Sequence, residues 1–320
     1  MSPTATPSRS SILAAFAAVY VIWGSTYFAI RVAIETVPPF AMAGARFLIA
    51  GAMLYVWARL RGAPGPGRTH WRRTALLGAL LLVGGNGGVV WAEQRVPSGL
   101  TSLLVAMVPV WTVLIEWLWT GGTRPTGRVA AGLVTGFAGV LLLVAPGRLA
   151  GGPHVDPIGA LVLLIASLSW SIGSVLARRI PLPASASLTS AMEMLAGGGL
   201  LLGLALATGE LAHIQPAAVS ARSAAAFVYL IVFGSLVGFS AFAWLLRFQP
   251  ASRVATYAYV NPAVAVLLGW ALAGEPLTPR TMLAALVIVS GVVLIANGRA
   301  TSEGQRRSAA PPSSCAGGVD

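Results

Sequence analysis

The chain has 320 residues, of which 56% are hydrophobic and only 9% charged, and its mean hydropathy is +0.80. Soluble domains carry about 25% charged residues, so this composition excludes a soluble protein and predicts an all-α integral membrane protein surrounded by the lipid bilayer. The net charge is +12, and all the basic residues are arginine. These arginines lie mainly in short loops between apolar runs. This pattern fits binding to lipid headgroups and argues against nucleic acid as a partner.

Apolar runs of roughly 18 to 24 residues, each long enough to cross a bilayer as a helix, recur along the whole chain. We place ten transmembrane helices at residues 11–31, 39–59, 73–92, 98–120, 127–146, 157–177, 186–208, 222–246, 250–273 and 280–298. The separators are short and rich in Gly, Pro and Arg, which leaves no room for a soluble domain. Residues 1–10 and 299–320 are polar and are predicted to be disordered cytoplasmic tails.

The arginines give these spans a direction. With the N-terminus inside, fifteen arginines fall on the inner side, five fall on the outer side and Arg46 lies within a span, which accounts for all 21 basic residues. The positive-inside rule therefore predicts that both termini are cytoplasmic.

The two halves of the chain repeat one pattern. At a constant offset of 153 residues, four pairs of identical residues align: Trp91 with Trp244, Pro97 with Pro250, Pro109 with Pro262, and Trp117 with Trp270. At an offset of 147, Trp23 aligns with Trp170 and Arg46 with Glu193. Five spans are an odd number, so the second copy must enter the membrane upside down. This predicts two inverted five-helix repeats, residues 11–146 and 157–298, with a substrate site between them near the midplane.

The chain resembles the EamA-type permeases of the drug/metabolite transporter superfamily. The resemblance rests on "IWGSTYFAIR" in the first span, "ARFLIAG" in the second, the proline-centred fourth and ninth spans, and "LAGEPLT" at the end of the ninth, and it covers about residues 12–298. It implies a secondary transporter of the bacterial plasma (inner) membrane, commonly an exporter of small metabolites. One feature departs from the family, which often has Gly-Glu after both duplicated spans: here only Gly274-Glu275 has it, and the first copy reads Gly121-Gly122.

Polar and aromatic side chains inside the spans are candidates to line the substrate pathway. Trp23, Thr26 and Tyr27 share one face of the first span, where an indole, a hydroxyl and a phenol can bind a solute. The alternative for this stretch is helix packing through its small residues. The other candidates are Asn86, Trp91, Trp170, Ser174, Tyr257 and Asn261.

Three of the charged residues within the spans are candidates for binding or coupling. Arg46 and Glu193 lie about eight residues into theirs, where a charge costs at least about 2.5–3.5 kcal/mol. One hypothesis has Arg46 attract a substrate carboxylate and Glu193 bind a coupling proton or cation. The alternative is an Arg46–Glu193 ion pair, or separate local pairings of the two residues, that serves only assembly. Glu116 is a second candidate for coupling, or it snorkels toward Arg124 or Arg128.

The sequence also makes predictions for prolines and glycines within the spans and for acids near their outer ends. Pro109 and Pro262 each free a backbone carbonyl, which makes either a mobile helix break or a tolerated kink. Close helix packing is predicted at the glycine pairs Gly132/Gly136, Gly199/Gly203 and Gly234/Gly238. The acids near the outer surface are predicted to be solvated: Glu35, Glu93, Asp156, Glu210 and Glu275.

Residues for other kinds of chemistry are scarce. Cys315 is the single cysteine and the three histidines have no ligand spacing, so we expect no metal and no cofactor. Without a buried Asp pair, a Ser/His pair or any lysine, neither an intramembrane enzyme nor an ATP-driven pump fits. The predicted function is secondary active transport of a small-molecule substrate, an amino acid being the first expectation, with a passive channel as the alternative. One chain contains both halves, so a monomer suffices and a dimer stays open.

Overall fold

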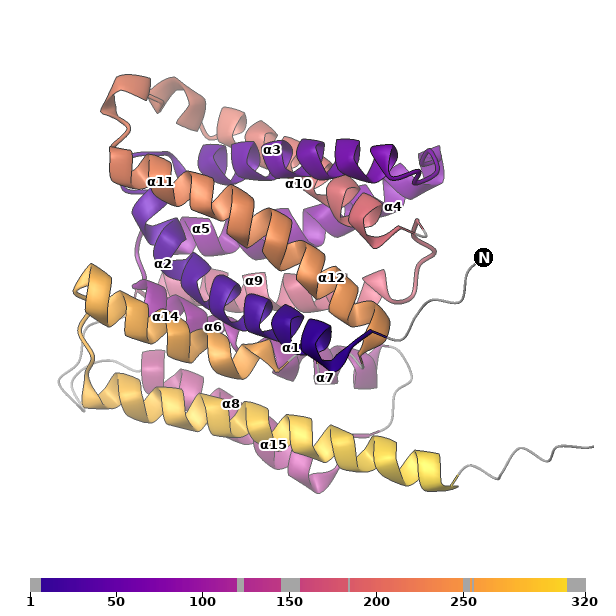
Figure 1. The fold of residues 1–320 in the computed structure, drawn as a ribbon. Coiled ribbons are helices and arrows are strands. Elements are labelled where there is room, and N and C mark those ends of the chain that lie inside the picture. Colours follow the sequence, from indigo (N-terminus) through magenta and orange to yellow (C-terminus); the bar gives the residue numbers. More distant parts are fainter. Residues whose placement is uncertain are drawn as a thin grey trace, which may run out of the picture.

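The computed structural model describes residues 7–119, 124–144, 156–183, 185–249, 254 and 256–309. All regular structure in these residues is helical (Figure 1). Eight helices are long and apolar enough to cross a membrane, and two shorter apolar helices, Val260–Ala273 and Pro279–Ile295, fall in the predicted ninth and tenth spans.

Several of the long helices are assembled from shorter segments. In the first half of the chain, the described segments are α1 Arg9–Ala18, the π-helical turn η1 Val19–Trp23, α2 Gly24–Ala33, α3 Pro39–Leu60, α4 Arg68–Gly78, the π-helical η2 Ala79–Gly87, α5 Gly88–Ala92, α6 Ser98–Val105, α7 Val108–Leu118 and α8 Gly127–Val144. In the second half, they are α9 Pro157–Ala177, α10 Ala186–Ala207, the 3₁₀ turns η4 Glu210–His213 and η5 Pro216–Ala218, α11 Ala221–Tyr229, the π-helical η6 Leu230–Val237, α12 Gly238–Phe248, α14 Tyr257–Ala273 and α15 Pro279–Ala309.

The two aligned prolines act differently on their helices. Pro109 lies at the start of α7, which is separated from α6 by Ala106 and Met107. A proline has no backbone N–H and clashes with the preceding turn, which explains why the helix is interrupted there. Pro262 instead lies inside α14, which continues as one helix on both sides of it. The predicted helix break therefore occurs at the first proline, and the second is accommodated within a helix.

Helices from the two halves pack in matching pairs. α3 packs along α10, and α8 packs along α15. α9 of the second half packs on η2, α5, α6 and α7, and α2 of the first half packs on α11, η6 and α14. α2 and α9 belong to the equivalent first spans of the two halves, and each packs on the third and fourth spans of the other half. A two-fold relation between the halves produces this kind of matching.

Glycines bring some of these helices close together. A Cβ atom on Gly132 would lie 2.6 Å from the carbonyl oxygen of Gly291, which makes the contact of α8 with α15 possible only with a glycine. Close packing was wrongly predicted at Gly199 and Gly203, because a Cβ atom on either would meet nothing within 4 Å. Both residues lie on the exposed face of α10, and sequence spacing alone does not tell which face of a helix meets a neighbour.

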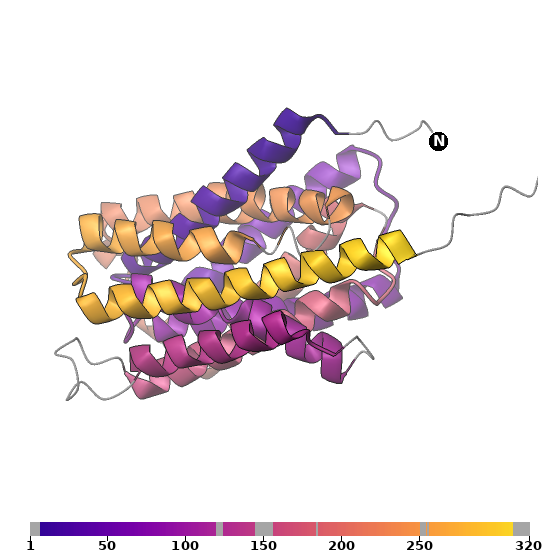
Figure 2. The same ribbon diagram turned by 90° about the horizontal axis from the view of Figure 1, so that it is seen from below.

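The start of α1 and the end of α15 lie at the same end of the bundle (Figures 1 and 2). We call this the arginine-rich end; it contains the connection 61–67 and residues 178–183 of the connection that follows α9. The opposite, arginine-poor end contains the connections 34–38, 93–97, 208–220 and 274–278. α15 stays helical to Ala309, so disorder from residue 299 was wrongly predicted for this stretch, whose Glu, Gln, Arg and Ala favour a helix. Residues 1–6 and 310–320 lie outside the described part.

Candidate functional site

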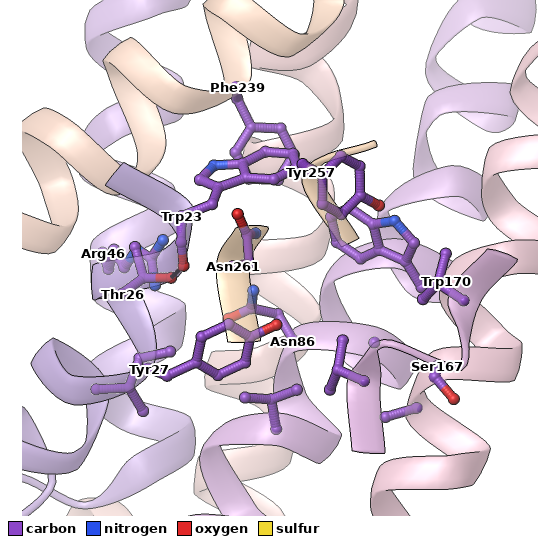
Figure 3. Close-up of a pocket in the computed structure, with 16 residues that line it drawn as sticks. Trp23, Thr26, Tyr27, Arg46, Asn86, Ser167, Trp170, Phe239, Tyr257 and Asn261 are labelled. Carbon is purple, nitrogen blue, oxygen red and sulfur yellow. Dashed lines mark hydrogen bonds between the residues drawn. The ribbon is translucent and has the colours of Figure 1, made fainter. Parts of the chain in front are cut away.

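A central cavity of about 70 Å³ lies between the two halves (Figure 3). Its walls come from η1, α2, α3, η2, α5, α6 and α7 of the first half and from α9, α12 and α14 of the second. The residues predicted to line a substrate pathway that meet here are Trp23, Thr26, Tyr27, Arg46, Asn86, Trp170, Tyr257 and Asn261. The structure therefore gathers most of the predicted pathway residues around one space.

Arg46 is held at one side of this cavity. Its side chain is 2% exposed, its Nε donates to the Oγ of Ser235 at 2.8 Å, and its guanidinium carbon lies 4.7 Å from the centre of the Phe47 ring. The Nη1 atom is buried without a hydrogen-bond partner. In the described part of the chain, no salt bridge joins Arg46 to Glu193. Of the two forms of the alternative, the ion pair therefore does not form, whereas the bond to Ser235 is a local pairing of Arg46. A buried donor of this kind is expected to be satisfied by a ligand or by water.

Asn86 provides the complementary group. It lies in η2, where neighbouring Gly85 lets the backbone approach Trp170: a Cβ atom on Gly85 would be 2.9 Å from that ring. The Oδ1 atom of Asn86 is buried and has no hydrogen-bond partner. The central cavity thus combines an unpaired cationic donor on Arg46 with an unpaired acceptor on Asn86, which suits a solute that carries both a carboxylate and an amine.

Two other polar residues of the cavity use their donors within the protein. The Oγ1 of Thr26 donates to the carbonyl oxygen of Trp23 at 2.7 Å. With its amide nitrogen turned toward them, Asn261 donates to the carbonyl oxygens of Tyr20 and Tyr257, each at 3.1 Å. Asn261 therefore ties α14 to η1, one helix from each half.

A second cavity of about 300 Å³, which we call the vestibule, lies between the central cavity and the connection that follows α9. The predicted residues Ser174 and Glu193 line it, and Trp170 and Tyr257 line it as well as the central cavity. Its volume reaches the lower range of small-molecule sites, about 300 to 1,000 Å³. The space that can accommodate a metabolite in this conformation therefore lies toward the arginine-rich end.

Four aromatic rings, which we call the aromatic partition, stand where the two cavities meet: Trp23, Trp170, Phe239 and Tyr257 (Figure 3). The ring of Trp23 lies 6.0 Å from that of Trp170 and 5.4 Å from those of Phe239 and Tyr257, mostly edge to face. Its Nε1 donates to the carbonyl oxygen of Gly234 at 3.2 Å. Edge-to-face pairs contribute about 0.5–1.5 kcal/mol each beyond burial, so the partition is a stable closure.

The arginine-poor end is closed by polar contacts. The Nη1 of Arg31 donates to the backbone carbonyl of Glu93 at 2.7 Å. The carboxylate of Glu275 accepts hydrogen bonds from the N and Oγ of Ser98, both at 2.7 Å, and from the N of Gly99 at 2.9 Å. These bonds cap the start of α6 and join it to the end of α14.

Not all the outer acids are solvated as predicted. Glu93 is 0% exposed, and Glu275 is half-buried as the cap of α6, so solvation was wrongly predicted for both. Glu35 is exposed and lies 3.8 Å from Arg222. Asp156 pairs with Arg95 at 3.4 Å. Glu210 is partly buried and accepts a hydrogen bond from the backbone N of residue 41 at 2.9 Å; burial raises its pKa, and backbone bonds from residues 41 and 40 lower it in part.

Two predicted residues lie away from the central cavity. Trp91 lines neither cavity; it lies near the arginine-poor end, with the guanidinium of Arg95 5.0 Å from its ring centre. Glu116 forms a salt bridge with Arg178 at 2.5 Å beside the vestibule. Sequence reasoning had not named Arg178 as a partner. It also missed Ser235 and Phe239; the one signal for Phe239 was the alignment of the two halves, in which it stands opposite Asn86.

Comparison with known proteins gives one consistent result. The EamA-like transporter family matches residues 9–145 and again residues 157–297. The chain is 42% identical over 289 residues to the "uncharacterized inner membrane transporter YedA" of Escherichia coli, covering 90% of this chain and 91% of the relative. It is 26% identical over 287 residues to a "probable amino-acid metabolite efflux pump" of Escherichia coli, covering 86% and 91%. One solved crystal structure shares the fold with a TM-score of 0.63 at 22% identity, covering 95% of this chain and all of that one.

Proposed function

Because the chain belongs to the EamA-like transporter family, we propose that it is a secondary active transporter of the bacterial inner membrane that moves small amphipathic metabolites, amino acids first among them. Its family and its relatives are named for transport rather than for an enzymatic reaction. The relative named an inner membrane transporter supports the location, and the one named an amino-acid metabolite efflux pump supports this cargo and the outward direction.

The architecture we propose is ten transmembrane helices in two inverted five-helix repeats, with both termini cytoplasmic. The matching contacts of the two halves support the repeats. The excess of arginine at the end that holds both the start of α1 and the end of α15 supports the orientation (Figure 1). In such repeats, one half rocks against the other around a site at their interface.

The observation that carries the proposal is a pair of buried, unpaired atoms on two residues that line the central cavity. The Nη1 of Arg46 can bind a carboxylate and the Oδ1 of Asn86 can bind an ammonium group, while the rings of the aromatic partition contact an apolar side chain. At about 70 Å³ the cavity is too narrow for an amino acid in this conformation, so binding requires the partition to open toward the vestibule. One chain supplies every wall of the site, so a monomer is sufficient.

A proton is the coupling ion we propose. Glu193 is buried where it lines the vestibule and has no salt-bridge partner among the described residues. Glu116 has a partner in Arg178, which makes it the weaker candidate.

The second candidate function is a passive channel or facilitator. The aromatic partition argues against a continuous pore, because its rings close the path between the cavities in the described part of the chain. A channel also has no need to alternate between two closed ends, whereas the proposed inverted repeats are suited to such alternation.

Counterflow in liposomes tests the proposal and separates the two functions. The purified protein is reconstituted, the liposomes are loaded with one unlabelled amino acid at a time, and uptake of the labelled form is followed without an ion gradient. A carrier accumulates label transiently above equilibrium, whereas a channel only equilibrates it. Accumulation for at least one amino acid, lost in Arg46→Gln at equal protein level, is the expected result. Plain equilibration would favour the channel, and no flux with any amino acid would overturn the assigned substrate class.

A further inference from the structure

Glu93 is a carboxyl group without a partner at the arginine-poor end. It directly follows α5, which ends at Ala92, and its side chain is 0% exposed. Neither Oε1 nor Oε2 has a hydrogen-bond partner, and none of the salt bridges among the described residues includes it. An ionised carboxylate is not stable in such a place, because nothing replaces the water that it has lost.

The neighbouring charges favour a protonated Glu93. Its position at the C-terminal end of α5 places it at the negative end of a helix dipole. The carboxyl group of Glu275, which acts on it electrostatically, accepts three hydrogen bonds at the start of α6. Glu93 has no such donors, so where the two carboxyl groups interact the proton is favoured on Glu93.

The opposing influence is Arg31. Its charge favours an ionised Glu93, but its Nη1 is directed to the backbone carbonyl of Glu93 rather than to the carboxyl oxygens. Burial raises the pKa of the Glu93 carboxyl well above its ordinary range, the Glu275 charge raises it further, and Arg31 lowers it. α2 also provides Tyr27, a further electrostatic neighbour, which lines the central cavity.

The other helices packed against α5 add no charge that faces Glu93. α9 has no titratable residue, and the aspartate before it, Asp156, pairs with Arg95 at 3.4 Å. α3 carries Arg46, which is bound to Ser235 of η6. Glu93 is thus a buried acid without a hydrogen-bond partner, and its electrostatic neighbour Tyr27 lines the central cavity.

We propose that Glu93 is a proton-binding site: it takes up one proton from water when the arginine-poor end of the bundle closes over it, and returns that proton when this end opens. The proposal rests on the alternating access proposed above. Only the O–H bond of the carboxyl group forms and breaks, so closing consumes one proton and opening releases one. Glu193 and Glu93 then lie on opposite sides of the aromatic partition, and each end of the bundle has its own acid.

The sign of the pH dependence follows from this coupling. The carboxyl has its raised pKa only in the closed conformation and an ordinary one when water reaches it. Closure is therefore most favoured at low pH and weakens as pH rises toward the raised value of the closed form. With one proton, the ratio of open to closed molecules changes at most about tenfold per pH unit.

Infrared spectroscopy of the protein in lipid tests the protonation directly. We expect a carboxylic acid C=O band at neutral pH that Glu93→Gln removes. Glu35→Gln is the matched control, because Glu35 is an exposed acid at the same end, beside Arg222, and it should leave the band unchanged. If Glu93→Gln does not reach the membrane, Glu93→Asp replaces it and should shift the band. An unchanged band in the Glu93 variant that folds would overturn the proposal.

Thiol labelling tests the coupling to opening. Ile30 is buried and lines the central cavity, so an Ile30→Cys, Cys315→Ser protein reacts with an impermeant reagent added from the arginine-poor side only when that end opens. The ratio of its labelling rate to that of the same protein with Glu93→Gln cancels the pH dependence of the thiol. We expect this ratio to rise by up to about tenfold per pH unit, and a flat ratio would overturn the coupling. Neither experiment uses a substrate, so a negative counterflow assay would leave both results standing.

Discussion

Replacing Gly238 by alanine tests how the aromatic partition is held together. Gly238 begins α12, and a Cβ atom there would lie 2.4 Å from the Nε1 of Trp23. The indole must then move away from the carbonyl of Gly234, to which it donates. Alanine gains about 1 kcal/mol of helix propensity, whereas overpacking costs about 1–3 kcal/mol and a stranded buried N–H about 1–3 kcal/mol. We expect a net loss of about 3 kcal/mol.

The controls are glycines of the same kind without neighbours. Gly199→Ala and Gly203→Ala place a Cβ in open space on α10 and should be neutral or up to about 1 kcal/mol more stable. Stability is measured by thermal unfolding in detergent and function by counterflow. Adding Trp23→Phe removes the indole, so it should reduce the cost of Gly238→Ala by about 0.5–3 kcal/mol. If Gly238→Ala is as stable as Gly199→Ala, or if the two costs simply add, the contact with Trp23 does not hold the partition.

Other predictions concern single groups of the site and its ends. Arg46→Gln should raise the KM for a carboxylate-bearing substrate by about 10–150-fold, since a charged hydrogen bond contributes about 1.5–3 kcal/mol, while Ser235→Ala, which keeps the charge, should raise it far less; uptake kinetics in liposomes measure both. Trp170→Ala joins the two cavities and should produce a leak of solute without counter-substrate, measured as efflux. Glu275→Ala removes the cap of α6 and should lower stability by about 0.5–2 kcal/mol in thermal unfolding. Because burial raises the pKa of Glu210, its contribution to stability is present at low pH and is lost as pH rises; Glu210→Gln should therefore reduce the loss of stability between pH 4 and pH 7.

The spans and the pathway residues were predictable because lipid imposes strict costs. Long apolar runs have few alternatives to membrane helices, and a polar group such as Arg46 or Asn86 in mid-span needs a protein or solute partner. The free-energy cost of a polar group depends on its depth in the membrane, and the position of the residue within its span gives that depth directly. The central cavity gathers these residues for the same reason.

What depends on the packing of neighbours was not predictable. Glu93 follows an apolar helix, and sequence position alone suggests that such a residue meets water, yet its side chain is fully buried. Ser235 became the partner of Arg46 because η6 lies beside α3, a contact between segments far apart in the chain. Gly199 and Gly203 share the spacing of packed glycines and still face outward. In each case, the deciding fact is which helix lies opposite.

The two halves place different side chains at equivalent positions, and this makes the two sides of the aromatic partition chemically different. Trp23 and Trp170 are equivalent in sequence, but Trp170 lines both cavities and Trp23 only the central one. Asn86 is equivalent to Phe239, which stands in the aromatic partition. If the repeats exchange conformations, Trp23 should take the place of Trp170 between two cavities, while the polar side chain of Asn86 has no counterpart in the other half.

The same asymmetry bears on coupling. At the offset that aligns Asn86 with Phe239, Glu93 stands opposite Leu246, so the repeat symmetry supplies no second acid of this kind. Arg46 likewise stands opposite Glu193, and the two line different cavities. A symmetric scaffold can rock equally well in both directions, and side chains present in one half alone can make the two end states respond differently to pH. Proton linkage at Glu93 favours closure of the arginine-poor end. Because alternating access couples the two ends, labelling from the arginine-rich side should depend on Glu93 with the opposite sign, falling as pH rises.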